Sequence, residues 1–353
     1  MKKLLIIALG SSLLSSCFLH NIPTIETYKG VPFHRAEAAE NFNKTERSIR
    51  SMDEVEIKRA FGTQTLPEFA VKSKSNAFLV FKQGKLLFEH YEKPLEVQSQ
   101  HAAFSVAKSM LSALVGIAIE EGKIKSDSDR VINYLPFLDS TEFNEVKIYH
   151  LLQMTSGIRY SEKDIFYSEN SKELFTDLKL KYATGEKHEY WSTSYQLLGY
   201  VLQTAIAPQT ISSYLEQKIW QPMGAQFPAD WTIEAESKVE KTFCCVQATA
   251  IDFAKFGMLY LNDGRANDKQ LIPQPWIEKS IAINEEEGSK KKYNYGWWFF
   301  SETSDQFLAR GFRGQYIYVD RKNETVIVRF GADWSGILTK KWADVFSQIS
   351  EQL

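Results

Sequence analysis

The apolar run between Ser109 and Glu120 constrains the fold more than any other part of the sequence. Its apolar side chains recur at steps of three and four residues: Met110, Leu111, Leu114, Val115 and Ala118. That spacing gives a helix one continuous buried face. The sequence therefore predicts a core helix that begins at Ser105 and ends at Glu121-Gly122.

Two polar side chains stand in the first turn of this helix. Ser105 and Lys108 are three positions apart, so their Cβ atoms are expected about 5–6 Å apart on one face. Burial favours neutral lysine, and a neutral amine can take the hydroxyl proton while the serine oxygen attacks a carbonyl. Free N–H groups and the positive end of the helix dipole would face the resulting oxyanion. The alternative is that Ser105 caps the helix and Lys108 points to solvent.

A second Ser-x-x-Lys pattern, Ser289 to Lys292, lies in a charged run without an apolar face. We expect it to be a solvated loop. Ser105 and Lys108 differ because they head an otherwise apolar helix.

The first sixteen residues have the pattern of an export signal: Lys2 and Lys3, a short apolar stretch, then small residues. The apolar stretch is too short to cross a bilayer as a stable helix. Leu14 to Cys17 resembles the lipobox of bacterial lipoproteins, in which the cysteine is lipidated. We therefore expect a signal peptide over residues 1–16 and a lipid anchor on Cys17 that holds a periplasm-facing protein to a bacterial membrane. The alternative is an ordinary secretory signal with an incidental cysteine.

The rest of the 353 residues suffices for one large domain or two interleaved subdomains. The formal net charge of −2 gives no reason to expect nucleic acid as a partner. Apart from Cys17, only Cys244 and Cys245 remain, and adjacent cysteines cannot join distant segments. The spaced Cys and His residues of a structural zinc site are also missing, so no metal is expected.

Strands are predicted near both ends of the chain, with helices between them. Residues 76–91 contain two apolar runs around Lys82-Gln-Gly-Lys85, the pattern of a β-hairpin. Later come strand-like segments at Tyr293–Phe300, Gln315–Asp320 and Thr325–Phe330, then an amphipathic stretch from Lys340 to Leu353. We expect an α/β (α+β) fold in which N- and C-terminal strands share one antiparallel sheet. The predicted domain covers residues 71–353, after a tether over 17–70, with a mainly helical subdomain inserted at roughly 122–285.

Six motifs follow one another along the chain: Phe104–Ser109, His150–Gly157, Tyr190–Gly199, Ala250–Gly257, Tyr295–Trp298 and Gly311–Asp320. In type and order they resemble the serine hydrolases of the class C β-lactamase and penicillin-binding-protein superfamily. Phe243-Cys-Cys and Gly314–Asp320 look most like the branch of 6-aminohexanoate-dimer hydrolases and related esterases. The resemblance implies the β-lactamase/transpeptidase-like fold, an antiparallel sheet flanked by helices.

The resemblance assigns roles around the first motif. Ser105 matches the acylated nucleophile of the superfamily, and Lys108 matches its paired amine. The oxyanion hole of these enzymes corresponds here to the backbone N–H groups of Ser105 and Phe312.

Tyr190 matches the tyrosine of the Tyr-x-Asn motif of the superfamily. A phenol near an ammonium group ionises more easily, so Tyr190 is expected to share the proton with Lys108 and pass it to the leaving group. Ser192 replaces the asparagine of this motif and lacks its reach, which weakens the case for an extended β-lactam or peptide amide as substrate. Judged without the resemblance, Tyr190 is one of 16 tyrosines and fits a structural role.

The third motif of the superfamily, Lys-Thr-Gly or His-x-Gly, falls on Ala309-Arg310-Gly311. Gly311 fits, because a bare backbone is needed where substrate lies against a strand edge. Ala309 replaces the cationic or imidazole residue, which puts in doubt the carboxylate binding seen in β-lactam enzymes and D,D-peptidases. Arg310 or Arg313 is the candidate for that charge, and a solvent-exposed strand arginine is the alternative.

Several other residues have reactive or aromatic side chains, but a structural role is expected for each of them. His188 lies two positions before Tyr190, so both side chains share a face if the segment is extended, but a structural histidine is the default. The Cys244-Cys245 pair is expected to be two small buried side chains, although relatives have a pocket nearby. The Trp297-Trp298 pair is expected to pack against the sheet.

These observations predict a serine hydrolase that cleaves an ester or amide bond of a small substrate through an acyl-enzyme on Ser105. No cofactor is expected, and the predicted partners are that small-molecule substrate and, through the lipid on Cys17, a membrane. A related alternative is a β-lactamase or D,D-carboxypeptidase acting on peptidoglycan-type substrates. An alternative of another class is a catalytically silent lipoprotein that binds in the cell envelope.

Overall fold

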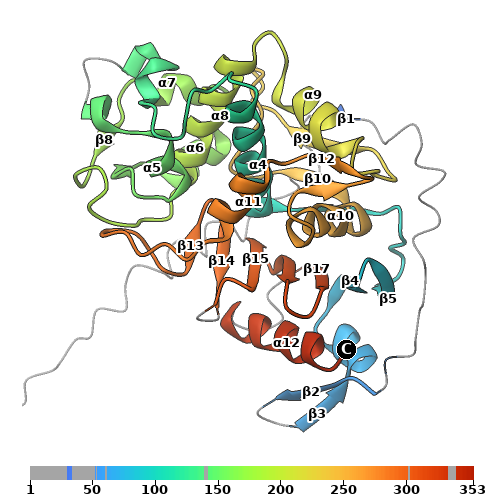
Figure 1. Cartoon of the computed structure of the whole chain (residues 1–353). Coiled ribbons are helices and arrows are strands. Elements are labelled where there is room, and N and C mark those ends of the chain that lie inside the picture. Colours follow the sequence, from blue (N-terminus) through green and yellow to red (C-terminus); the bar gives the residue numbers. More distant parts are fainter. Residues whose placement is uncertain are drawn as a thin grey trace, which may run out of the picture.

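The computed structural model describes residues 30–33, 52, 54–59, 62–138, 142–300, 303–332 and 339–353. Its main feature is a seven-stranded sheet in which neighbouring strands are antiparallel (Figure 1). In spatial order the strands are β13 (Tyr293–Asn294), β14 (Trp297–Phe299), β15 (Gln306–Gly311), β16 (Gln315–Asp320), β17 (Thr325–Gly331), β4 (Ser75–Lys82) and β5 (Lys85–Tyr91). Because β17 pairs with β4, strands from both ends of the chain share this sheet, as predicted.

The α-helices are α3 (Leu66–Lys72), α4 (Ala107–Glu120), α5 (Ile148–Leu152), α6 (Glu162–Tyr167), α7 (Ser171–Phe175), α8 (Ser192–Ile206), α9 (Ile211–Leu215), α10 (Ala250–Leu261), α11 (Gln274–Ile281) and α12 (Thr339–Glu351). The 3₁₀ turns are η3 (Phe104–Val106), η4 (Val131–Asn133), η5 (Pro136–Leu138) and η6 (Glu142–Glu145), and η7 (Glu216–Trp220) is a π-helical turn. A four-stranded sheet contains, in order, β1 (Gly30–Phe33), β9 (Ala229–Thr232), β10 (Val246–Thr249) and β6 (Gln100–Ala102). Two-stranded pairs are β2 (Glu56–Arg59) with β3 (Gly62–Thr65), β7 (Ile158–Arg159) with β8 (Lys179–Leu180), and β11 (Arg265–Ala266) with β12 (Lys269–Gln270).

The predicted hairpin at residues 76–91 is formed by β4 and β5. Gln83 and Gly84 join the two strands and have φ angles of 50° and 74°. Two successive positive φ values give the backbone twist that a tight turn between antiparallel strands requires. The predicted strand Gln315–Asp320 is β16, and the amphipathic C-terminal stretch is α12.

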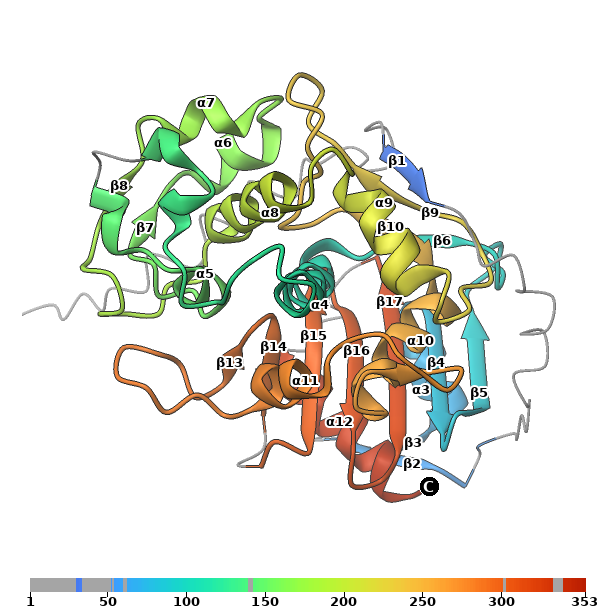
Figure 2. The same cartoon turned by 45° about the horizontal axis from the view of Figure 1, so that its top comes forward.

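Both faces of the main sheet are covered by helices. On one face Trp342 and Phe346 of α12 pack against sheet residues that include Tyr316. The other face is covered by α10, where Gly257 allows close contact with Ile317 and Val326. Figure 2 shows α4 between the sheet and a group formed by α5, α6, α7 and α8. The N-terminal end of α4 therefore lies where the sheet meets the helical group.

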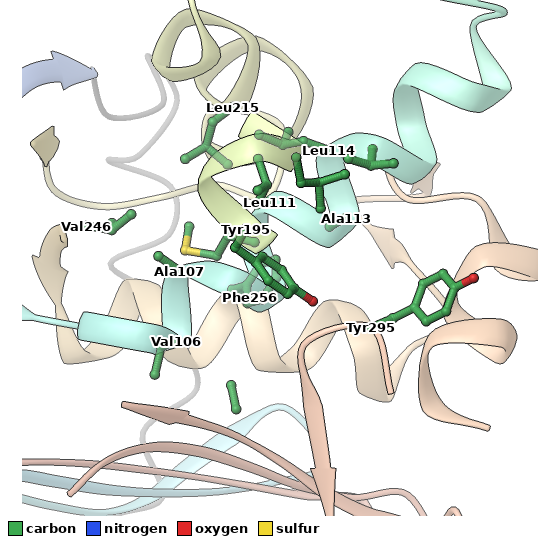
Figure 3. Close-up of a cluster of buried hydrophobic side chains, with 14 of the residues drawn as sticks. Val106, Ala107, Leu111, Ala113, Leu114, Tyr195, Leu215, Val246, Phe256 and Tyr295 are labelled. Atoms are coloured by element: carbon green, nitrogen blue, oxygen red, sulfur yellow. The ribbon is translucent and has the colours of Figure 1, made fainter. Parts of the chain in front are cut away.

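Helix α4 is buried more completely than its sequence predicts. Apolar spacing predicts one buried face, but every residue from Ala107 to Ala118 is buried. Figure 3 shows Leu111 and Leu114 of this helix with Tyr195 of α8 and Leu215 of α9 beside them. Residues at the start of α4 are consequently anchored to a rigid, fully surrounded element.

The packed structure extends upstream of the predicted domain boundary at residue 71. Ile57 of β2 and Leu66 and Phe69 of α3 are buried in a cluster that includes α12. The four-stranded sheet is also absent from the predictions, because its strands are only three or four residues long and show little alternation.

The expected signal peptide at residues 1–16 and the lipidation site Cys17 lie outside the described residues. Within the described ranges, the structure contains no helix that has both the length and the apolar character of a membrane span.

Candidate active site

Ser105 lies in the 3₁₀ turn η3, directly before α4. The α-helix therefore begins at Ala107, two residues later than predicted. The residue before the serine, Phe104, has a φ of 48°, which is uncommon for a bulky side chain. No side chain caps η3 or α4, so the alternative in which Ser105 is an N-cap is wrong.

Lys108 is the immediate partner of the serine. Its Nζ lies 3.0 Å from Ser105 Oγ and 2.6 Å from the carbonyl oxygen of Phe243. The lysine is only 1% exposed, and burial lowers its pKa to about 7, while the nearby charge of Glu162 opposes that shift. The alternative of a solvent-facing lysine is wrong. The amine is a base of suitable strength within reach of the serine proton.

Tyr190 stands two residues before α8, and its ring centroid lies 5.0 Å from Lys108 Nζ. Burial raises the pKa of Tyr190 above its usual range, and this effect exceeds the lowering by the Ser105 hydroxyl and the Arg310 charge. The expectation that this phenol ionises easily is therefore wrong in direction. Because an ionised oxygen would be poorly solvated here, Tyr190 holds its proton in the resting site, and a positive charge on the neighbouring Lys108 would make that proton easier to release.

Glu162 is a site residue that the motifs do not identify. Its Oε1 accepts a hydrogen bond of 2.6 Å from the backbone N–H of Ser192, at the start of α8. Its negative charge raises the pKa of both Lys108 and Tyr190. The only sequence signal is Ser161 directly before Glu162, a helix-start pattern that carries no functional information by itself. Ser192, which stands where the Tyr-x-Asn motif has asparagine, is 7% exposed and therefore largely buried.

The end of β15 lies against the turn that contains the nucleophile. A Cβ atom at Gly311 would lie 2.2 Å from the carbonyl oxygen of Ala103, so this position requires glycine. The sequence analysis attributes the need for glycine to a substrate that lies against the strand. In the structure, the atom that approaches Gly311 is the Ala103 carbonyl oxygen. The Phe312 and Phe104 rings meet edge to face at 5.6 Å. Both contacts hold this end of β15 against the turn that contains Ser105.

The two adjacent tryptophans have different environments. Trp297 is fully buried and packs against Tyr260 and Phe307 in the core. Trp298 is half-buried, and its ring lies 5.5 Å from that of Tyr190. Trp298 is therefore the tryptophan of this pair that borders the site, a choice that sequence alone does not allow.

His188 and the cysteine pair do not touch the reacting atoms. The His188 ring packs edge-on to Tyr293 at 5.5 Å, and burial lowers its pKa to about 4, so it is neutral near pH 7. Cys244 and Cys245 are both buried, as predicted, and they form a disulfide with each other, which the sequence interpretation does not include. Phe243, directly before this cysteine pair, supplies the carbonyl oxygen that accepts a hydrogen bond from Lys108.

In the part of the chain that the structure describes, no group of three or more His, Cys, Asp or Glu side chains is placed to hold a metal ion. The geometry instead unites an alcohol, a buried amine and a protonated phenol. That set can attack a carbonyl, accept the alcohol proton and protonate a leaving group.

The sequence matches the Beta-lactamase family over residues 70–336, more than half of the chain. The 6-aminohexanoate-dimer hydrolase of Paenarthrobacter ureafaciens is 23% identical over 305 residues, which cover 78% of this chain and 76% of that protein. A solved Bacillus anthracis protein, provisionally named a 6-aminohexanoate-dimer hydrolase, has a TM-score of 0.80 and 22% identity over 91% of this chain and 89% of its own. A penicillin binding protein from Bacillus halodurans has a TM-score of 0.64 and 17% identity, over 81% and 98% of the two chains.

These similarities confirm both the fold and the resemblance that the motifs predict. The structural neighbours share the β-lactamase/transpeptidase-like fold. The family match covers both the nucleophile turn and the end of β15. The chain belongs to the Beta-lactamase family of serine hydrolases.

Proposed function

We propose that this protein hydrolyses an ester or amide bond of a small substrate through an acyl-enzyme formed on Ser105. The observation that carries the proposal is the 3.0 Å contact between Ser105 Oγ and Lys108 Nζ. With a pKa of about 7 for the buried amine, about half of Lys108 is neutral at pH 7. A neutral amine at this distance can accept the serine proton.

In the acylation step, the Ser105 oxygen bonds to the substrate carbonyl carbon and its proton passes to Lys108 Nζ. The backbone N–H groups of Ser105 and Phe312 are proposed to hold the oxyanion. As the intermediate collapses, the bond to the leaving oxygen or nitrogen breaks and Tyr190 gives that atom its proton. The proton gained by Lys108 then returns to Tyr190, which restores both groups.

In the deacylation step, water attacks the acyl carbonyl carbon and gives a proton to Lys108. As the bond to the Ser105 oxygen breaks, the proton held by Lys108 passes to that oxygen, and the carboxylic acid is released. Ser192, Gly311 and Arg310 are the proposed substrate contacts. Arg310 has the strongest support, because its charge acts on Tyr190, whereas Ser192 is buried and Gly311 faces Ala103.

Substrate preference distinguishes the proposed ester or amide hydrolase from an enzyme that acts on β-lactams or peptidoglycan-type peptides. Ala309 is buried and uncharged at the position where the resemblance calls for lysine or histidine. We expect the purified protein to release p-nitrophenol from acyl esters and to be labelled by fluorescent penicillin well below one molecule per chain. Stoichiometric penicillin labelling without ester hydrolysis would favour the β-lactam-recognising alternative instead.

We also propose that the chain is exported and anchored to a bacterial membrane by lipid on Cys17. The support is the sequence pattern of residues 1–17 alone. After expression in a Gram-negative host, the wild-type protein is expected in the membrane fraction and Cys17→Ala in the soluble fraction. A Cys17→Ala protein that still sediments with membranes after a high-salt wash would contradict the lipid anchor.

A further inference from the structure

The disulfide between the adjacent residues Cys244 and Cys245 directly follows the backbone group that holds the proposed base. The carbonyl oxygen of Phe243 accepts a hydrogen bond of 2.6 Å from Lys108 Nζ. The same nitrogen lies 5.9 Å from the centroid of the Phe243 ring, so both the backbone and the ring of that residue are near the amine. The backbone of the cysteine pair is therefore continuous with the group that positions Lys108.

The residue after the cysteine pair holds the turn that contains the nucleophile. The carbonyl oxygen of Val246 accepts a hydrogen bond of 2.8 Å from the backbone N–H of Ala103, which directly precedes the turn η3 with Ser105. Val246 begins β10, and this strand pairs with β6, the strand that leads into the same turn. The cysteine pair therefore connects the support of the base to the support of the nucleophile.

The backbone of the cysteine pair has a conformation that the disulfide helps to maintain. Cys245 has a φ of 77°, in the left-handed region that favours glycine. Rotation of this residue toward negative φ would change the relative orientation of the chain segments before and after the pair. The ring closed by the S–S bond opposes that rotation. Hydrogen bonds from Trp231 Nε1 to the Cys244 carbonyl and from the Thr232 N–H to the Cys245 carbonyl fix the rest of this backbone.

Reduction of the disulfide would remove this restraint. Two electrons and two protons from a dithiol convert the S–S bond into two thiols, and the dithiol becomes a disulfide in turn. Two unbonded sulfur atoms must lie about 3.5 Å apart or more, whereas bonded ones are about 2 Å apart. Both cysteines are buried, so the sulfur atoms have little space in which to separate. Their separation must therefore displace the backbone of the pair.

The other groups around Lys108 do not depend on the cysteine pair. Ser105 Oγ lies 3.0 Å from Nζ, and the ring centroids of Tyr190 and Tyr195 lie 5.0 and 5.8 Å from it. The charge of Glu162 also acts on the amine. A carbonyl oxygen accepts a stronger hydrogen bond from an ammonium group than from a neutral amine. Displacement of the carbonyl before the pair should therefore both loosen Lys108 and favour its neutral form.

We propose that the Cys244–Cys245 disulfide positions Lys108 through the Phe243 carbonyl, and that reduction by a dithiol slows catalysis. The inference rests on the proposed hydrolase function and adds redox control to the same site. The reductant is a dithiol, either a small molecule or the reduced pair of a thiol–disulfide exchange protein. The two cysteines are positioning residues, because they act on the reacting atoms through Phe243.

The test uses Cys17→Ala protein, in which Cys244 and Cys245 are the only cysteines. The protein is treated with dithiothreitol, freed of the reagent without air, and later reoxidised. Mass spectrometry after alkylation of the unfolded chain gives the reduced fraction. We expect reduction to lower kcat for a p-nitrophenyl ester by at least about tenfold, with a smaller change in KM. The ascending limb of the pH profile should move to lower pH by about one unit, and reoxidation should restore both properties.

Cys244→Ser/Cys245→Ser protein is the matched control for the reagent. It is expected to have the low kcat and the displaced limb before treatment and to show no response to dithiothreitol. If this variant does not fold, the reversible treatment of the disulfide form decides by itself. Free thiols at both positions in fully active, untreated protein would overturn the proposal. A loss of rate that only parallels thermal unfolding, with the limb in place, would also overturn it, because the disulfide would then merely stabilise the fold.

Titration of Lys108 separates failure of this positioning role from failure of the hydrolase proposal. In protein labelled with ¹³C-lysine, the Cε signal that is missing from Lys108→Met reports the ionisation without any turnover. A midpoint at about pH 7 in the disulfide form that moves to lower pH on reduction supports the positioning role, even if no ester is hydrolysed. If esters are hydrolysed through Ser105 but neither the midpoint nor the limb responds to reduction, the positioning role is overturned and the hydrolase proposal stands.

Discussion

Replacement of Ser105 by alanine is expected to lower kcat/KM for p-nitrophenyl esters by at least about 10⁴-fold. The variant lacks the oxygen that forms the acyl-enzyme. Lys108 keeps the Phe243 carbonyl as a hydrogen-bond partner, and Ser105 caps no helix. The melting temperature is therefore expected to change by no more than about 3 °C. Nitrophenol release and thermal unfolding of the same preparations measure the two effects.

Ser112 provides a matched control for this variant. It lies on the same helix and is fully buried, and its hydroxyl has no hydrogen-bond partner among the described residues. Ser112→Ala should therefore keep turnover near the wild-type level. Ester hydrolysis that survives in Ser105→Ala would remove Ser105 from the mechanism.

The pH dependence of kcat/KM is expected to follow the protonation of Lys108. Below a pKa of about 7 the amine is protonated and cannot accept the Ser105 proton, whereas above it the amine is neutral. The rate should therefore rise with pH through about 7, with a tenfold loss for each unit well below that value. Lys108→Met is expected to lower kcat/KM by about 10³-fold and to abolish this ascending limb.

The Glu162→Gln variant tests whether the ascending limb of the pH profile reports the ionisation of Lys108. The charge of Glu162 stabilises the ammonium form and so raises the pKa of Lys108. Removing that charge should move the ascending limb to lower pH, so that the variant keeps a larger fraction of its maximal rate at pH 6. Glu285→Gln, at an exposed carboxylate paired with Lys291, is the control and should leave the limb in place. A limb that does not move in Glu162→Gln would assign the ionisation to another group.

Local spacing in the sequence is enough to predict much of this arrangement. The apolar positions of α4 predict a core helix, and the three-residue step from Ser105 predicts the contact with Lys108 that the structure contains. The turn residues Gln83 and Gly84 predict the hairpin in the same way. Such features depend on residues that are neighbours in the chain, so a pattern can reveal them.

Properties that depend on tertiary surroundings are not predictable in this way. The pKa direction of Tyr190 follows from burial by distant segments, and the sequence shows only its neighbours. The carboxylate of Glu162 reaches Ser192 across 30 positions, and Trp298 differs from Trp297 only through the face of the sheet it occupies. The motif marks position 311 as one that needs glycine. The cause, the close approach of the Ala103 carbonyl oxygen, is visible only in the folded chain.

The central claim is that the oxygen of Ser105 becomes acylated. The most direct measurement is mass spectrometry of peptides from protein treated with a fluorophosphonate that reacts with activated serines. We predict one adduct, on the peptide that contains Ser105, and a strongly reduced yield of it in Lys108→Met. An adduct on a different serine, or none in a preparation that hydrolyses esters, would contradict the account.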